Sequence, residues 1–185
     1  DLYCNAKFKK IPNIAYKQKR EIRGKYYSVF LNELIQPDSF EVLKFKRGLK
    51  ITSNILQNVK NVGNKVAQWL TWDSDNNLDK SGDYYLVPSE SLIRRLCDCE
   101  DHSFINASIY EEIGIAWGFF NKNIGHAFNI FINENKLYIL DTVGDIAEII
   151  EYTPTCNYEI YFIITKKNTY ELKSGIEFGE IAGWQ

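Results

Sequence analysis

The clearest hydrophobic pattern in the chain is a pair of apolar runs joined by a polar tip. Residues 127–132 and 136–140 are rich in aromatic and β-branched side chains, which favour strands. The three residues at the tip, Asn133 to Asn135, have the composition of a turn. The pattern therefore predicts a β-hairpin whose alternate side chains lie on opposite faces of a sheet.

The predicted hairpin places a histidine opposite an aspartate. A symmetric turn centred on Asn133 and Glu134 pairs His126 with Asp141 across the two strands. Directly opposed Cβ atoms lie about 4.5–5.5 Å apart, which lets a carboxylate reach an imidazole nitrogen. A shift of the register by one residue would put the two side chains on opposite faces of the sheet.

A second pattern predicts a helix that begins at a cysteine. Apolar residues recur with roughly helical spacing at Phe104, Ile105, Ile109 and Ile113. Gly114 is a natural stop, and Asp98 is a favourable N-cap, so Cys99 takes the first helical position. There the free N–H groups and the helix dipole would stabilise a thiolate and lower the thiol pKa.

The remaining pattern predicts one α+β domain without internal repeats or linkers. Helices are expected at residues 53–70, at 88–95 with Ser89 as the cap, and briefly from 38–41. Strands are expected at residues 146–152 and 160–164. Residues 71–85, 114–125 and 166–185 have the composition of loops or turns. Gly63 inside the first helix suggests close packing, and Trp117, Phe119 and Phe120 are interpreted as core residues.

Charge is distributed unevenly along the chain. The net charge is −2, but residues 1–60 hold 13 Lys and Arg against 5 Asp and Glu, and the remainder is acidic. We interpret the chain as one domain, residues 1–185, with a basic N-terminal extension at about 1–50 that lies on the acidic body. No aromatic-basic RNA motif or zinc finger accompanies the charge, so nucleic acid is not the expected partner.

The sequence pattern does not predict a membrane-spanning or signal segment that would indicate the cellular compartment. No run of 18 apolar residues predicts a transmembrane helix, and the first ten residues lack the apolar core of a signal peptide. Since the chain contains no Met, we expect a processed product, an excised domain or part of a longer chain. A disulfide between Cys4 and Cys156 is compatible with the sequence but not required by it. Four cysteines in a chain of this length do not make a disulfide scaffold. The cellular compartment stays undetermined.

The residues around Cys99 resemble the nucleophile region of transglutaminase-like cysteine peptidases. In the bacterial branch of that superfamily, a D-Y-W-x-x-P stretch commonly precedes G-D-C-E-D. Residues 83–85 and Pro88 match the first stretch, with Tyr85 in place of Trp. Residues 98–101 match the second stretch, with Cys97 in place of Gly. This departure alters the turn before the nucleophile and adds a second thiol, which is able to form a disulfide.

The resemblance extends over roughly residues 55–145, because 125–129 and 139–142 are similar to the family's histidine and aspartate strands. It implies a papain-like fold, in which the helix that bears the cysteine packs on an antiparallel sheet. It also implies a triad of Cys99 as nucleophile, His126 as general base and Asp141 as its orienting carboxylate. The oxyanion donors would be the Cys99 backbone N–H and one side chain among Tyr84, Tyr85, Gln68 and Trp72.

Metal binding gives two further hypotheses for the same segment. The resemblance implies a calcium site near Asp98 and Glu100, because some family members bind calcium near these positions. Further oxygen atoms would come from Asp73, Asp75 and Asp79. The alternative is a capping aspartate with a solvated acidic loop. A zinc site would use Cys97, Cys99 and His102, closed by Cys156 or His126, but a second closely spaced ligand pair is missing. We interpret His102 as a surface or packing residue.

These observations predict a thiol-dependent acyl-transfer enzyme, most simply a cysteine peptidase or amidase with a protein or peptide substrate. It requires no cofactor, and calcium is an optional one. One alternative is a structural module of the same fold within a larger assembly, such as a virus particle. Another is a transglutaminase that crosslinks proteins, since hydrolysis and aminolysis pass through the same thioester.

Overall fold

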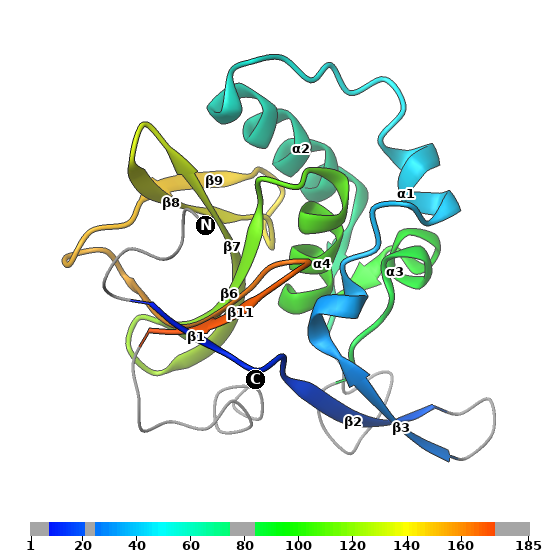
Figure 1. Cartoon of the computed structure of the whole chain (residues 1–185). Helices are drawn as coiled ribbons and strands as arrows, with labels where there is room; N and C mark the ends of the chain where they lie inside the picture. Colours follow the sequence, from blue (N-terminus) through cyan, green and yellow to red (C-terminus); the bar gives the residue numbers. More distant parts are fainter. Residues whose placement is uncertain (1–7, 21–24, 75–83, 173–185) are drawn as a thin grey trace.

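An antiparallel sheet is the main feature of the computed structural model, which describes residues 8–20, 25–74 and 84–172 (Figure 1). In these ranges the sheet has seven strands in the order β1-β11-β10-β6-β7-β8-β9. Their bounds are β1 (Lys9–Ile11), β6 (Gly114–Phe120), β7 (Ile124–Asn133), β8 (Lys136–Asp141), β9 (Glu148–Glu151), β10 (Tyr158–Ile164) and β11 (Thr169–Glu171). A separate hairpin joins β2 (Ala15–Arg20) to β3 (Lys25–Phe30), and β4 (Thr71–Trp72) pairs in parallel with β5 (Leu96–Cys97).

The helices lie together on one side of this sheet (Figure 1). They are the 3-10 turn η1 (Leu31–Leu34) and the helices α1 (Phe40–Phe45), α2 (Ile55–Trp69), α3 (Pro88–Arg94) and α4 (Cys99–Ile109). Every residue of α4 is buried, so this helix is the centre of the domain rather than a cover on its surface. The predicted α+β arrangement, a helix that begins at Cys99 and packs on an antiparallel sheet, is therefore confirmed.

Helix α2 packs on α4 and on strand β8 through an apolar face. Val59, Val62 and Val66 are fully buried, and the Asn54 side chain caps the helix by accepting a hydrogen bond from the Gln57 N–H at 2.9 Å. A Cβ atom on Gly63 would lie 2.6 Å from Leu140 Cδ1, closer than real Cβ contacts come. Gly63 therefore allows the close approach of α2 to β8, as its position in the helix suggested.

The register of the β7–β8 hairpin differs from the prediction by two residues. Asn133 pairs with Lys136 and Asn129 with Leu140, so the turn is Glu134-Asn135 rather than Asn133-Glu134. Both turn residues have positive φ, 50° and 61°, as in the tight hairpin turns whose twist matches that of the strands. Because side chains alternate with period two, a shift of two residues leaves every side chain on its predicted face.

The segment after α4 differs more from the prediction. The helix ends at Ile109, before the expected stop at Gly114, and residues 114–120 form strand β6 instead of a turn-rich loop. β6 lies between β10 and β7, and six of its seven residues are buried. A strand covered on both faces has no alternation of polar and apolar residues, so the period of two that reveals a strand is missing from its sequence.

Three smaller predictions also change. α3 begins at Pro88 with Val87 in the N-cap position, so Ser89 is not the cap. The expected C-terminal loop contains β11, which pairs with both β1 and β10. Leu31, Leu34 and Val42 are buried in the core, so part of the segment expected to form a basic extension is integral to the domain. In the described ranges no helix is long and apolar enough to cross a membrane.

Candidate active site

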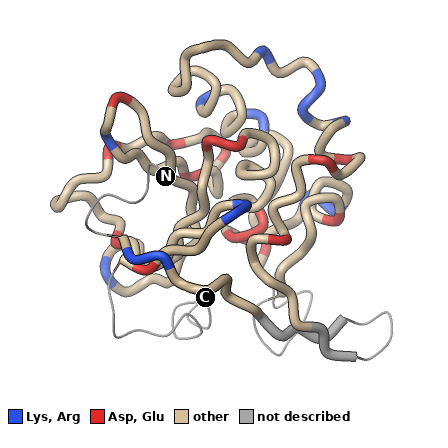
Figure 2. Tube along the Cα trace, in the orientation of Figure 1, with Lys and Arg blue, Asp and Glu red and all other residues tan. Residues whose placement is uncertain are grey.

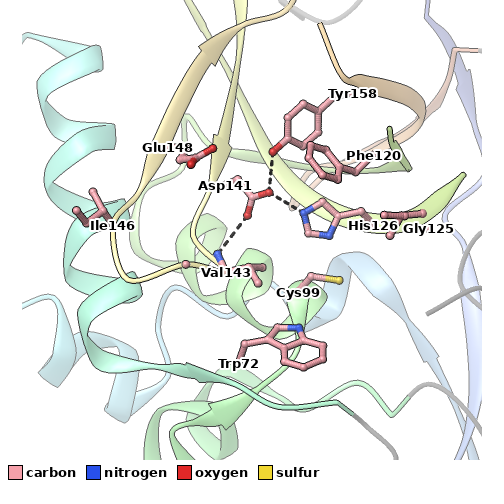
Figure 3. A pocket seen from close by; sticks show the side chains of 12 residues that line it. Trp72, Cys99, Phe120, Gly125, His126, Asp141, Val143, Ile146, Glu148 and Tyr158 are labelled. Atoms are coloured by element: carbon pink, nitrogen blue, oxygen red, sulfur yellow. Dashed lines mark hydrogen bonds and ion pairs between the residues drawn. The ribbon is translucent and has the colours of Figure 1, made fainter. Parts of the chain in front are cut away.

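A pocket of about 450 Å³ brings together the three residues of the predicted triad (Figure 3). Cys99 comes from the start of α4, His126 from β7 and Asp141 from the end of β8. Trp72, Phe120, Ile124, Gly125, Val143, Gly144, Ile146, Glu148 and Tyr158 complete the lining. The rim is mainly apolar, since the side chains of Trp72, Ile124 and Ile146 are exposed.

The Cys99 side chain lies between the first turn of α4 and strand β7. The backbone N–H of Ala127 donates to Cys99 Sγ at 3.5 Å, which places the sulfur beside the residue that follows His126. The thiol itself donates to Glu100 Oε2 at 3.4 Å. Cys97, in the position where the family usually has Gly, is buried in β5 and its thiol points to the Ser91 carbonyl oxygen at 3.6 Å. Cys97, Cys99 and Cys156 are all free thiols.

The predicted lowering of the Cys99 pKa is wrong. Burial raises the pKa of this thiol well above its ordinary value, and the negative charges of Glu100 and Asp98 raise it further. The Ala127 N–H acts in the opposite direction but is weaker. The Cys99 side chain is therefore a protonated thiol, despite its place at a helix N-terminus.

His126 and Asp141 form the contact that the hairpin pattern predicted. His126 Nε2 lies 2.7 Å from Asp141 Oδ2. In the observed register Asp141 stands diagonally across from His126 rather than directly opposite, a separation that long side chains still span. The other ring nitrogen, Nδ1, is on the side of the imidazole that faces Cys99 (Figure 3).

Two further groups hold the Asp141 carboxylate. The Tyr158 hydroxyl donates to Oδ2 at 2.9 Å, and the Val143 backbone N–H donates to Oδ1 at 3.2 Å. Burial opposes the charge on Asp141, but the hydrogen bonds and the imidazole outweigh it, so the pKa of the carboxyl is lower than usual. Burial and the negative charge of Asp141 raise the pKa of Tyr158, which keeps its hydroxyl protonated as a donor.

Aromatic rings surround the His126 imidazole. Phe128, Tyr158 and Phe120 have ring centroids 5.8, 6.3 and 6.4 Å from the imidazole. Trp117 and Phe119 are core residues, as predicted from composition, whereas Phe120 also lines the pocket. These rings restrict the orientations of the imidazole and keep it aligned with Asp141.

Tyr158 reaches this site because of an irregularity in β10. The register between β10 and β6 shifts between Ile160 and Phe162, which leaves Tyr161 as an extra residue in a bulge. Opposite the bulge, a Cβ atom on Gly118 would lie 1.7 Å from the Glu159 carbonyl oxygen, so only glycine fits there. The sequence pattern missed Tyr158, because its contact with Asp141 depends on the order of the strands in the sheet.

The two carboxylates expected as calcium ligands lie on either side of Cys99 in the sequence. Asp98 takes the N-cap position of α4, but its side chain accepts no hydrogen bond from the first turn, so the capping role is not observed. Glu100 is fully buried, and its Oε1 atom has no hydrogen-bond partner among the described residues. Asp101, which completes the acidic motif, accepts a hydrogen bond from the Leu86 N–H at 2.9 Å instead.

Metal-binding groups of three or more His, Cys, Asp or Glu side chains are absent from the part of the chain that the structure describes. Cys97, Cys99 and His102 therefore do not gather into a zinc site with the other described residues. Asp73 is described and pairs with Arg94 at 3.9 Å, whereas Asp75, Asp79 and Cys4 lie outside the described residues.

His102 is a packing residue in the centre of the domain. Its side chain is buried, and burial lowers the pKa of the imidazole to about 4, so it is neutral at pH 7.

One turn further along α4, the Asn106 amide donates to Asn129 Oδ1 and to Thr142 Oγ1, both at 2.9 Å. This amide therefore links α4 to the strand of His126 and to the residue that follows Asp141.

The side chains expected as oxyanion donors lie in different places. Trp72 lines the pocket, and the pairing of β4 with β5 holds it opposite Cys97, two residues before Cys99. Tyr85 is buried in the core, and Gln68 lines a different depression on the surface. Tyr84, like these two, is not among the residues that line the pocket.

The sheet, the central helix and the pocket at its N-terminus together define a transglutaminase-like fold with a papain-like core, as the motifs implied. A calcium-bound structure of LapG from Legionella pneumophila superimposes with a TM-score of 0.57 at 18% identity, over 80% of this chain and 88% of LapG. An EGTA-treated structure of the same LapG gives 0.56 at 17% identity, over 83% and 91%. A structure described as a TGase gives 0.43 at 17% identity, over 62% of this chain and 31% of its own. The sequence itself matches no protein-family model and no curated protein.

Proposed function

We propose that this protein is a thiol-dependent acyl-transfer enzyme, a cysteine peptidase or amidase that acts on a protein or peptide. Cys99 is the nucleophile, His126 the general base and acid, and Asp141 the carboxylate that orients the imidazole. The observation that carries the proposal is the 2.7 Å contact between His126 Nε2 and Asp141 Oδ2, in a pocket that Cys99 also lines. A buried carboxylate on one nitrogen directs the basic nitrogen toward the thiol.

The reaction begins with a neutral thiol, because the pKa of Cys99 is raised. His126 Nδ1 accepts the thiol proton as Cys99 Sγ bonds to the carbonyl carbon of the scissile amide. The developing imidazolium is stabilised by Asp141, whose lowered pKa keeps it ionised. His126 then returns the proton to the leaving amine as the carbon–nitrogen bond breaks, which leaves a thioester on Cys99. Water attacks the thioester with His126 as base, and this step releases the acid and restores the thiol.

Hydrolysis and crosslinking pass through the same thioester, so the test must distinguish the two. The purified protein is incubated with a denatured proteome whose amines are blocked, and new N-termini are identified by mass spectrometry. A parallel reaction contains dansylcadaverine, an amine that a crosslinking enzyme would attach to substrate acyl groups. We expect new termini with wild-type protein and none with Cys99→Ala or His126→Ala.

Two outcomes would revise this proposal. Dansyl label without new termini would assign the thioester to aminolysis and make the enzyme a transglutaminase. New termini at the same level with wild type and Cys99→Ala, or neither new termini nor dansyl label with wild type, would contradict the proposed triad. His102→Gln serves as the control, because this buried imidazole is neutral and lies outside the pocket lining.

We also propose that calcium binds at Asp98 and Glu100. Calcium prefers carboxylate oxygen atoms, and Glu100 Oε1 is a buried oxygen with no hydrogen-bond partner in the described part of the chain. Two carboxylates are fewer than a full ligand set, which backbone carbonyls and water commonly complete. LapG, which has the same fold, was solved both calcium-bound and EGTA-treated. Calcium bound there would offset the two negative charges that raise the pKa of Cys99.

A further inference from the structure

We infer that a second pocket, between α1, α2 and α3, binds an acidic peptide segment of a partner protein that carries an apolar anchor side chain. This helical pocket has a volume of about 440 Å³. Its lining includes Lys44, Phe45, Lys65, Trp69, Ile93 and Arg95. None of its lining residues belongs to the pocket of Cys99, so the inference does not rest on the proposed catalysis.

The floor of the helical pocket is a fixed aromatic surface. The Trp69 indole N–H donates to the Leu92 carbonyl oxygen at 3.1 Å, and the Phe45 ring packs edge-on against it at 5.6 Å. Trp69 is nevertheless 38% exposed. Beside it, Ile93 is 71% exposed. Rigid aromatic rings next to an exposed aliphatic side chain are typical of the pocket that receives an apolar anchor.

Arg95 adds a recognition group for carboxylates at the edge of this floor. Its Cζ atom lies over the Trp69 ring, 3.6 Å from the ring centroid, and this contact restricts the orientation of the guanidinium. Among the described residues no carboxylate pairs with it. A planar guanidinium held in this way presents parallel N–H groups, which match the two oxygens of a carboxylate.

The charges around the helical pocket favour an acidic partner. Lys44, Arg47, Lys65 and Arg95 line it, against Glu41 as the acidic residue of the lining. Lys65 is occupied by the carbonyl oxygens of Phe45 and Arg47, which fixes the end of α1, but its charge remains. Lys and Arg positions continue along the linker from α1 to α2 (Figure 2). The exposed aliphatic surface of Ile93 has no counterpart in a phosphodiester backbone, so a peptide fits better than a nucleic acid.

The test uses a phage-displayed library of random dodecapeptides, selected on the immobilised full chain. Enriched sequences should combine at least two Asp or Glu residues with an aromatic or aliphatic side chain. The affinity of one synthetic enriched peptide is then measured by fluorescence anisotropy at low and high salt. Arg95→Gln and Ile93→Ser should each weaken binding by at least tenfold, and salt should weaken it too. Lys60→Gln is the matched control, because Lys60 is exposed on α2 but outside the lining and loses the same charge.

Other results would overturn the inference. These are no enrichment, enrichment of neutral or basic peptides, or equal affinity for wild type and Arg95→Gln. A labelled 20-base-pair DNA duplex is measured in parallel, and binding that depends on Arg95 would assign the pocket to nucleic acid instead. If Arg95→Gln lowers the melting temperature, Arg47→Glu replaces it, since Arg47 is exposed and lines the same pocket.

Discussion

At the scale of single residues, Cys99 shows two opposing influences on one thiol. A helix N-terminus stabilises an anion by about 0.3–1 kcal/mol in exposed settings. Full burial shifts the pKa of a group by up to several units, and here Glu100 and Asp98 add like charge next to it. Burial and the two carboxylates raise the pKa of Cys99 more than the helix N-terminus lowers it. The thiol therefore needs a nearby base to accept its proton.

The first prediction tests the effect of Glu100 on this thiol. With a chelator present, Glu100→Gln should raise the rate of iodoacetamide alkylation of Cys99 at pH 7 several-fold, because it removes a negative charge beside the sulfur. Peptide mapping by mass spectrometry measures the rate at Cys99 separately from the other thiols. Glu148→Gln is the control, since Glu148 lines the same pocket but is not a cause of the raised pKa. An unchanged or slower rate in Glu100→Gln would contradict the charge effect.

The second prediction concerns the support of His126. Asp141→Asn keeps the shape of the side chain but removes the charge that stabilises imidazolium, and should lower turnover by roughly 10³- to 10⁴-fold. Tyr158→Phe removes one donor to Asp141 and should lower turnover only by roughly 2- to 10-fold. The rate of appearance of new N-termini measures both variants. Equal losses in the two variants would mean that the charge of Asp141 has no special role.

The third prediction concerns pH and folding stability. Because the pKa of folded Asp141 is lower than the ordinary value of 3.8, ionised Asp141 stabilises the folded state at pH values above this value. That contribution disappears as the pH falls through the lowered pKa, where the folded protein also takes up the proton. Urea unfolding from pH 7 to pH 3 should therefore show the difference between wild type and Asp141→Asn shrinking toward low pH. A difference that stays constant or grows would contradict this linkage.

At the scale of elements, the site depends on how closely β10 can approach β6. The bulge between Ile160 and Phe162 brings the Glu159 carbonyl into the space where Gly118 would carry a Cβ atom. The segment of β10 directly before this bulge carries Tyr158, whose hydroxyl donates to Asp141. A glycine in the middle of a strand normally weakens it, and here it marks the close approach of another backbone.

The fourth prediction follows from that approach. Gly118→Ala should lower the free energy of unfolding by about 3 kcal/mol or more, because its Cβ meets a backbone atom that no rotamer change can move. Gly144→Ala is the matched control, since its Cβ would meet its nearest atom at 3.9 Å, and should change stability by less than about 0.5 kcal/mol. Urea unfolding measures both. A small effect at Gly118 would mean that the bulge relaxes easily.

At the scale of the whole molecule, α4 connects the two layers of the domain. Cys99 begins this helix between the two proposed calcium ligands Asp98 and Glu100, and Asn106 further along binds Asn129 on β7 and Thr142 directly after β8. A ligand at the first turn therefore acts on the element that holds the layers together. Binding to the folded state alone raises global stability by mass action.

The fifth prediction uses this coupling to test calcium. At a concentration 100-fold above the dissociation constant, calcium should stabilise the fold by about 2.7 kcal/mol, which raises the melting temperature by roughly 5–10 °C. Glu100→Gln should abolish the rise, whereas Glu148→Gln should retain it, because Glu148 lies on β9 and outside the acidic motif. Differential scanning calorimetry with calcium and with EGTA measures the difference. Identical curves for wild type in both would contradict a calcium site.

The sequence by itself determined the features that depend on local periodicity. The strand pattern around the hairpin placed His126 and Asp141 on one face, and this result survives the two-residue change of register, because faces depend only on whether a shift is even or odd. The helical spacing after Asp98 likewise placed Cys99 at the first helical position. Both predictions rest on neighbours along the chain, which the printed sequence contains.

Only the tertiary structure decided the features that depend on which elements become neighbours. The composition of the residues in β6 predicted a loop. Only the structure shows that they form a strand between two others, covered on both faces. The role of Tyr158 depends on the order of strands in the sheet. The raised pKa of Cys99 depends on how completely the folded chain excludes water from α4, which the local spacing of residues does not determine.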